Sequence, residues 1–109
     1  MVNVGVLANK LVAFVARKAV GLPVDDNDLR RLTGTVLYPV MREVVKRVSS
    51  NIVTMRNGLP RCNICGKGPF TRRGLYLHLI RVHRYDIISL LEEEYRNIVD
   101  IIAPFDRKY

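Results

Sequence analysis

Residues 61–83 read RCNICGKGPFTRRGLYLHLIRVH, and this stretch decides the fold of the 109-residue chain. It contains both cysteines and both histidines of the sequence, in the order C-x2-C-x12-H-x4-H: Cys62, Cys65, His78 and His83. Two thiolates three residues apart fit one tight turn, and two imidazoles five residues apart lie near one side of a helix end. The spacing therefore predicts four ligands for one tetrahedral Zn²⁺ ion.

The predicted zinc site is structural and closed, because four protein ligands leave no coordination position for water or substrate. Two other interpretations of the cysteine pair are weaker. A thioredoxin-like redox motif expects a βαβ context, which the sequence lacks. A lone disulfide across two residues would leave the histidine spacing unexplained. We also find no nucleophile–base pair and no spare histidine, so we expect neither an enzyme nor a small-molecule substrate.

The segment from about residue 59 to 84 resembles the Cys2His2 zinc-finger family. The resemblance is carried by the run 62–67 (CNICGK) together with Phe70, Leu75, His78 and His83. It implies a ββα unit with both cysteines on the hairpin and both histidines on the helix. The family places a core aromatic four residues after the second cysteine. Here Pro69 holds that place and Phe70 follows it, so we expect an altered hairpin turn.

The rest of the chain predicts helices. Residues 2–21 are apolar around most of a helical circumference, a short helix follows a cap at Asp25 or Asp26, and residues 36–49 repeat apolar side chains every three or four positions. Residues 50–60 predict a connector with at most one short strand, in which Asn57–Gly58 could close a hairpin into the finger. Thr71 can cap the finger helix, and Asp86 can cap an amphipathic, acidic helix that follows the finger and ends before Pro104. We expect a mainly α fold: an N-terminal helical region (1–55), an inserted ββα zinc finger (56–84) and a C-terminal helix (85–109) packing on the N-terminal region.

The formal charge of +8 is unevenly distributed. Residues 56–84 hold seven Lys or Arg and no acidic residue, whereas residues 85–109 hold six acidic and three basic residues. Positive charge concentrated on the finger predicts a polyanionic partner there, and a solvated cationic face is the alternative. The candidate nucleic-acid contacts are Arg61, Lys67, Arg72, Arg73, Tyr76, Arg81 and Arg84.

Zinc fingers of this family mostly bind nucleic acid, and the resemblance assigns their base-reading positions to Thr71, Gly74 and Leu77. None of the three offers the bidentate donors that distinguish bases, which predicts contact mainly with the phosphate backbone. One hypothesis is a small DNA-binding regulator, resembling the single-finger proteins of crenarchaea and their viruses, with the apolar N-terminal helix as a homodimer interface. A second is an RNA-binding protein, such as a ribosomal component.

A third hypothesis is a protein-interaction or purely structural zinc module, supported by the acidic C-terminal helix and the apolar N-terminal helix. We expect a cytoplasmic location, since cysteines used for metal suit a reducing compartment. Lys10 and the pair Arg17–Lys18 interrupt the first apolar run, so no membrane span is expected. A helix lying on a membrane surface is the remaining alternative for that segment.

Overall fold

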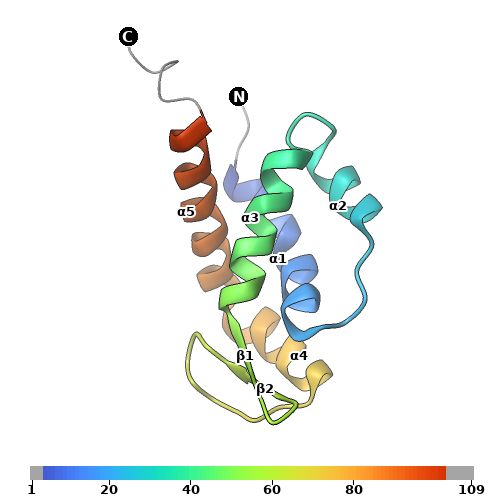
Figure 1. Ribbon diagram of the computed structural model, residues 1–109, viewed down its shortest axis with the longest axis vertical. Coiled ribbons are helices and arrows are strands. Elements are labelled where there is room, and N and C mark those ends of the chain that lie inside the picture. The colour runs from blue at the N-terminus through green and yellow to red at the C-terminus, as the bar shows by residue number, and fades with distance from the viewer. Residues whose placement is uncertain (1–3, 103–109) are drawn as a thin grey trace.

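The computed structural model describes residues 4–102, which form a mainly helical fold with one small antiparallel sheet (Figure 1). The elements in chain order are α1 (Val4–Val20), α2 (Asp26–Thr33), α3 (Tyr38–Asn51), β1 (Val53–Arg56), β2 (Leu59–Cys62), α4 (Arg72–Val82) and α5 (Arg84–Ile102). The expected mainly α class is confirmed. Pro104, expected to end the last helix, lies outside the described residues.

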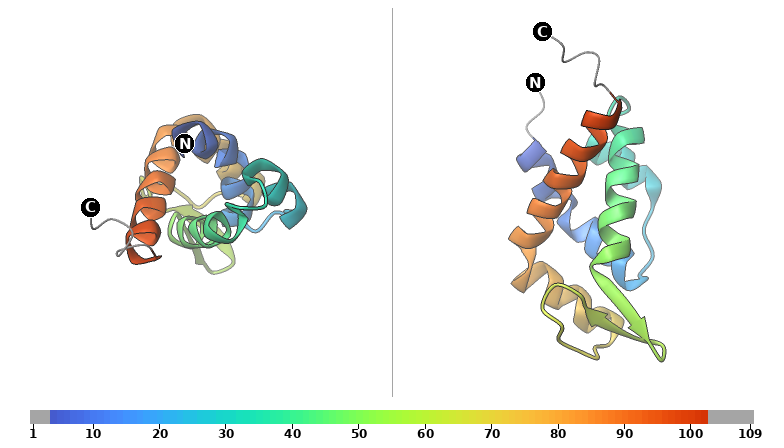
Figure 2. Two further views of the ribbon diagram at one scale, coloured as in Figure 1. Left: turned by 90° about the horizontal axis from the view of Figure 1, so that it is seen from above. Right: turned by 60° about the vertical axis from the view of Figure 1, so that its left-hand side comes forward.

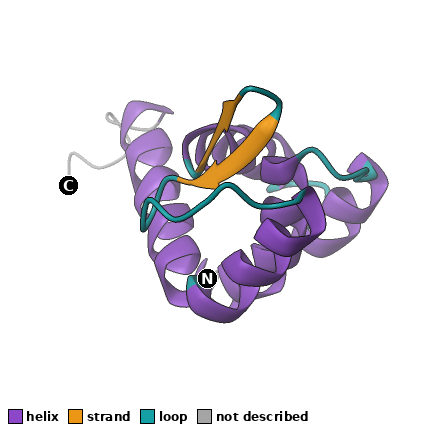
Figure 3. Cartoon of the chain, turned by 90° about the horizontal axis from the view of Figure 1, so that it is seen from below, coloured by secondary structure: helices purple, strands orange, loops and turns teal. Residues whose placement is uncertain are grey.

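Three long helices, α1, α3 and α5, run side by side along the molecule, as two views show (Figures 1 and 2). The sheet and α4 lie together at the end of the molecule opposite the free end of α5. Seen from that end, the hairpin and the loop after it cross the ends of the helices (Figure 3). We call α1, α2, α3 and α5 the helical body, and residues 53–83 the metal end.

Helix α1 is the centre of the packing. It contacts each of the other four helices of residues 4–102. Its buried side chains lie around most of its circumference: Leu7, Ala8, Leu11, Val12, Phe14, Val15, Ala16 and Val20. The sequence predicted that so apolar a helix must be buried on most sides, and the chain itself supplies that burial. These side chains therefore do not require a second copy to cover them.

The helix starts follow local capping chemistry. The Asp25 carboxylate accepts a hydrogen bond from the Asn27 N–H (2.9 Å) and starts α2. Helix α3 begins with Pro39 in its first turn, where the missing N–H costs nothing. It starts at Tyr38, two residues later than expected, because Val36 lies in a turn and is 90% exposed. The Thr71 hydroxyl accepts a hydrogen bond from the Gly74 N–H (3.0 Å) and caps α4 as predicted.

The sheet lies earlier in the chain than the cysteine spacing suggests. Strands β1 and β2 pair antiparallel with Val53 opposite Cys62, and their turn is Asn57–Gly58. Both turn residues have positive φ (54° and 78°), as the favoured two-residue hairpin turn requires. We expected at most one short strand between residues 50 and 60. Cys62 is the last residue of β2, and Cys65 lies in the turn that follows it.

One continuous core joins the helical body and the metal end. Cys62, Leu75 and Leu79 of the metal end are fully buried in the same cluster as the side chains of α1, α3 and α5. Helix α4 packs against α1 and β2, while α5 packs against α1 and α3. Among residues 4–102, no helix combines the length and the apolar character that crossing a membrane demands.

Candidate metal centre

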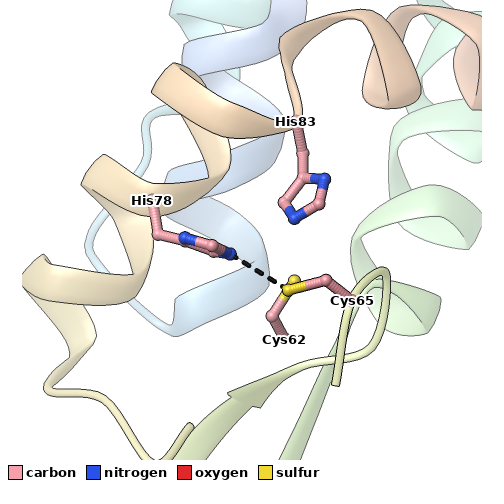
Figure 4. Close-up of side chains that lie close together, drawn as sticks. All are labelled: Cys62, Cys65, His78 and His83. Atoms are coloured by element: carbon pink, nitrogen blue, oxygen red, sulfur yellow. Dashed lines mark hydrogen bonds between the residues drawn. The ribbon is translucent and has the colours of Figure 1, made fainter. Parts of the chain in front are cut away.

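Four metal-ligating side chains converge at the metal end, at the junction of the sheet and α4 (Figure 4). They are Cys62, Cys65, His78 and His83, and their ligand atoms all lie within 4.8 Å of one another. The thiols come from the end of β2 and the turn after it, and the imidazoles come from α4 and its C-cap. This group is close enough to hold one metal ion.

The turn over residues 62–66 brings the two thiols together. The Gly66 N–H donates to the Cys62 carbonyl (2.8 Å), and the Cys62 N–H donates to the Lys67 carbonyl (2.9 Å). Gly66 has a φ of 80°, in the left-handed region where glycine carries no steric penalty. Beyond the turn, the Phe70 N–H donates to the Pro60 carbonyl (2.9 Å), so residues 67–70 return alongside β2 without forming a strand.

Helix α4 sets the positions of the two imidazoles. His83 follows the last helical residue, and its N–H still donates to the Leu79 carbonyl (3.0 Å), which continues the helical path. His78 and His83 are five residues apart, which is little more than one helical turn. The His78 Nε2 lies 3.4 Å from the Cys65 Sγ. Phe70 stacks on the His78 ring with centroids 4.9 Å apart, which restricts the ring from outside. The displaced aromatic therefore still packs beside a ligand.

His83 shows the strongest fit to a bound metal. Its Nδ1 lies 2.8 Å from an Asp86 carboxylate oxygen, while its Nε2 is buried and is the unpartnered buried side-chain polar atom of residues 4–102. A carboxylate at Nδ1 favours the tautomer with the proton there, leaving the Nε2 lone pair available as a metal ligand. The sequence marks Asp86 only as a candidate helix cap, so its contact with His83 is a finding of the structure. The signal for it in the sequence is a carboxylate three residues after the last predicted ligand.

The electrostatics of the two thiols differ. The pKa of the exposed Cys65 thiol is lowered to about 6, first by the backbone N–H of Lys67 and then by the neighbouring His83. Burial raises the pKa of the Cys62 thiol, partly offset by backbone N–H groups of the turn. Burial alone would lower the pKa of His83, but the hydrogen bond to Asp86 and the contact with Cys65 together raise it.

The seven predicted nucleic-acid contacts divide into two groups. Lys67, Arg73 and Arg81 are exposed, and none of their side chains has a hydrogen bond or ion pair with any other residue of 4–102. The other four, Arg61, Arg72, Tyr76 and Arg84, make contacts within the chain. The structure thus brings all four predicted metal ligands together. It leaves only three of the seven predicted nucleic-acid contacts without a side-chain partner among residues 4–102.

The contacts of the other four residues hold the metal end together, attach it to the helical body, or join two helices of the body. Arg72 donates to the Gly21 carbonyl at the end of α1 (3.3 Å), and Arg84 donates to the Asn9 side chain (3.2 Å). Tyr76 is half-buried against the core, with the Arg17 guanidinium 6.0 Å from its ring centroid. Arg61 donates to the Gly66 carbonyl (3.4 Å). The contacts of Arg72 and Tyr76 come from the packing of α4 on α1, and the contact of Arg84 joins the start of α5 to α1. The sequence does not reveal this packing.

Comparisons with protein-family models, curated proteins and solved structures found no significant match to this chain. The geometry of the four ligands and the surface of α4 therefore carry what is proposed below.

Proposed function

We propose that the four-ligand site holds one structural Zn²⁺ ion. Two thiolates and two imidazoles are a ligand set that zinc prefers, and four protein ligands complete its tetrahedral shell. Asp86 orients His83 for this role, as carboxylates commonly orient zinc-bound histidines. In this proposal β2, the returning segment 67–70 and α4 form a ββα zinc finger resembling the Cys2His2 family. Strand β1 then extends the finger hairpin by one strand toward α3.

We further propose that the protein binds nucleic acid through the phosphate backbone. The observation that carries this is the outward side of α4, where Arg73 and Arg81 are exposed and have no partner among residues 4–102. They lie eight residues apart, about 12 Å along the helix axis. The major groove of B-form DNA is also about 12 Å wide, so the two guanidinium groups can reach phosphates on both of its sides. Lys67 adds an exposed charge nearby in sequence.

The side chains between these arginines favour backbone contact over base reading. Thr71 is occupied by the helix cap, and Gly74 has no side chain to offer. Leu77 is half-exposed and lies outside the core cluster, so it presents only an apolar surface. Apolar groups contact the thymine methyl but cannot donate to guanine or adenine edges. We therefore expect affinity that depends strongly on salt and weakly on sequence.

Two targets fit this surface. The finger resemblance favours duplex DNA and a regulator, whereas the lack of base-reading donors favours a structured RNA, including a ribosomal one. One finger spans about three base pairs, so selectivity would have to come from the shape of the target or from additional contacts by the helical body. The core shared by α4 and the helical body, together with the hydrogen bond from Arg72 to the Gly21 carbonyl, supports presentation of α4 at a fixed angle.

The test compares the double variant Arg73→Ala/Arg81→Ala with wild type, on a fluorescent DNA duplex and a fluorescent RNA hairpin of equal length. We expect weaker binding to every sequence of the preferred class, and a slope of log K against log salt that falls by about one per lost phosphate contact. The matched control is Lys10→Ala/Lys46→Ala, which removes the same charge from exposed sites of the helical body. Equal losses in both variants would leave a general charge effect and remove α4 as the binding surface.

A further inference from the structure

A groove lies beside the metal centre, between the end of α3, the 62–66 turn and the first half of α5. Its volume is about 570 Å³, within the range of ligand-binding clefts. Its lining includes three apolar side chains: Ile52, which is 2% exposed, and the half-buried Ile64 and Leu90. It is thus an apolar trough formed by three segments that are far apart in the sequence.

One wall of the groove is fixed by hydrogen bonds to its own neighbours. The Asn63 N–H donates to the Ile52 carbonyl (2.9 Å), and its side-chain amide donates to the Asn51 carbonyl (2.9 Å). Its side-chain oxygen accepts a hydrogen bond from the Thr54 hydroxyl. Asn63 therefore attaches the turn both to the end of α3 and to β1. A groove whose walls are already fixed loses little conformational entropy when a ligand enters.

The rim of the groove is charged, and its charges are arranged along α5. Asp86 and Glu93 lie on the rim, and the Glu93 carboxylate has no hydrogen bond or ion pair with another residue of 4–102. Arg96 lies ten residues from Asp86, about 15 Å along the helix, and carries the one positive charge of the lining. Helix α5 as a whole has five acidic and two basic residues. The lining itself carries two acidic side chains and one basic side chain, a net charge of −1.

We propose that this groove binds a short peptide segment of a partner protein, in which apolar side chains alternate with Lys or Arg. The apolar side chains would lie on Ile52, Ile64 and Leu90. The basic side chains would pair with Asp86 and Glu93, away from Arg96. A phosphate backbone is repelled by the same carboxylates, so this surface differs in chemistry from the outward side of α4. One molecule can then hold nucleic acid and a protein segment at separate places.

The groove also depends on the metal centre. Ile64 lies between the two cysteine ligands in sequence, and Asp86 holds His83 through the 2.8 Å contact at Nδ1. Loss of the turn would remove one wall, and reorientation of Asp86 would remove part of the rim. The peptide segment therefore binds only the metal-loaded form of the chain.

The first test pans a phage-displayed random peptide library on the metal-loaded full chain, with clones tested in parallel on Ser89→Arg. Ser89 is exposed and lines the groove, so an arginine there fills it and opposes a basic ligand. We expect enriched peptides with apolar residues next to Lys or Arg, and no binding of these peptides to Ser89→Arg. No enrichment, enrichment of acidic peptides, or equal binding to the variant would each overturn the proposal.

The second test measures an enriched peptide by fluorescence anisotropy on charge-reversed variants. Glu93→Lys should weaken it at least about tenfold, since like charges at an interface are strongly unfavourable. Glu92→Lys makes the same charge change one residue earlier, outside the groove lining, and should leave binding within about twofold of wild type. Equal losses in the two variants would mean that only the overall charge of α5 matters, which contradicts a groove.

Sedimentation velocity identifies the remaining possible occupant. The wild-type chain should be monomeric at peptide-binding concentrations. Self-association that Ser89→Arg abolishes would make a second copy the occupant and overturn the proposal. Nucleic-acid binding should be the same in Ser89→Arg and wild type, so a failure of the groove and a failure of the α4 surface can be told apart.

Discussion

The helical body and the metal end share one core but are stabilised by different means. Helix α1 alone buries eight apolar side chains, several of them with no exposed surface. The whole of residues 53–83 buries only Pro60, Leu75 and Leu79 as apolar groups, beside the ligand Cys62. A segment with so few buried side chains cannot offset its own conformational entropy. The difference predicts that the helical body folds by burial, and that the metal end needs a bound metal to fold on it.

Replacement of the buried ligand gives the largest expected effect on this comparison. We expect the Cys62→Ser variant to bind no zinc, because the three remaining ligands cannot close the tetrahedral site. Nucleic-acid binding should be lost with it. Far-UV circular dichroism should fall by no more than the share of α4, and zinc content can be measured by mass spectrometry. Collapse of the whole helical signal would instead mean that the two regions unfold as one unit.

The contrasting prediction concerns a core residue of the helical body that is not itself a ligand. Leu11 is completely buried at the centre of α1. We expect Leu11→Ala to destabilise the protein by about 2–5 kcal/mol, through lost burial and the remaining cavity. Zinc stoichiometry should stay at one per chain. Urea denaturation in the presence of zinc measures the first quantity, and loss of zinc from the folded variant would show that the body also holds the site together.

The sequence predicted the four ligands and the helices because both follow from local spacing. Apolar repeats of three and four residues identified α3 and α5, and the caps at Asp25 and Thr71 marked helix starts. Each of these depends on residues a few positions apart. The β1–β2 pair was underestimated, since only Asn57–Gly58 signals it and β1 has little apolar alternation to mark it as a strand.

Long-range packing explains what the sequence could not provide. Arg72, Arg73 and Tyr76 all lie on α4, and their residue types alone do not indicate which of them contact α1. Contacts over a separation of 51 residues decide it, as between Arg72 and Gly21. The groove beside the metal centre has the same origin, since α3, the turn and α5 meet there only in the folded chain.

The Asp86 carboxylate sharpens the comparison, because it joins α5 of the helical body to His83 of the metal end. We expect Asp86→Ala to weaken zinc affinity by about 10–100-fold, as the loss of such an outer contact commonly does. Asp86→Asn keeps an acceptor for the Nδ1–H and should recover part of the loss. Competition with a chromophoric chelator measures the affinities, with Glu92→Ala as the control. Unchanged affinity in Asp86→Ala would make the contact incidental.

The smallest expected effect comes from Arg72, where the two regions touch at the surface. Its guanidinium donates to the Gly21 carbonyl at 3.3 Å across an exposed junction, so Arg72→Ala should cost about 1 kcal/mol or less in unfolding free energy. Arg73→Ala, one residue further on, breaks no contact within residues 4–102 and should leave stability unchanged while weakening nucleic-acid binding. Comparing the two variants distinguishes a side chain that attaches α4 to α1 from one that binds nucleic acid. If Arg72→Ala weakens binding as much as Arg73→Ala and costs no stability, its contact with α1 is replaced by one to phosphate when nucleic acid binds.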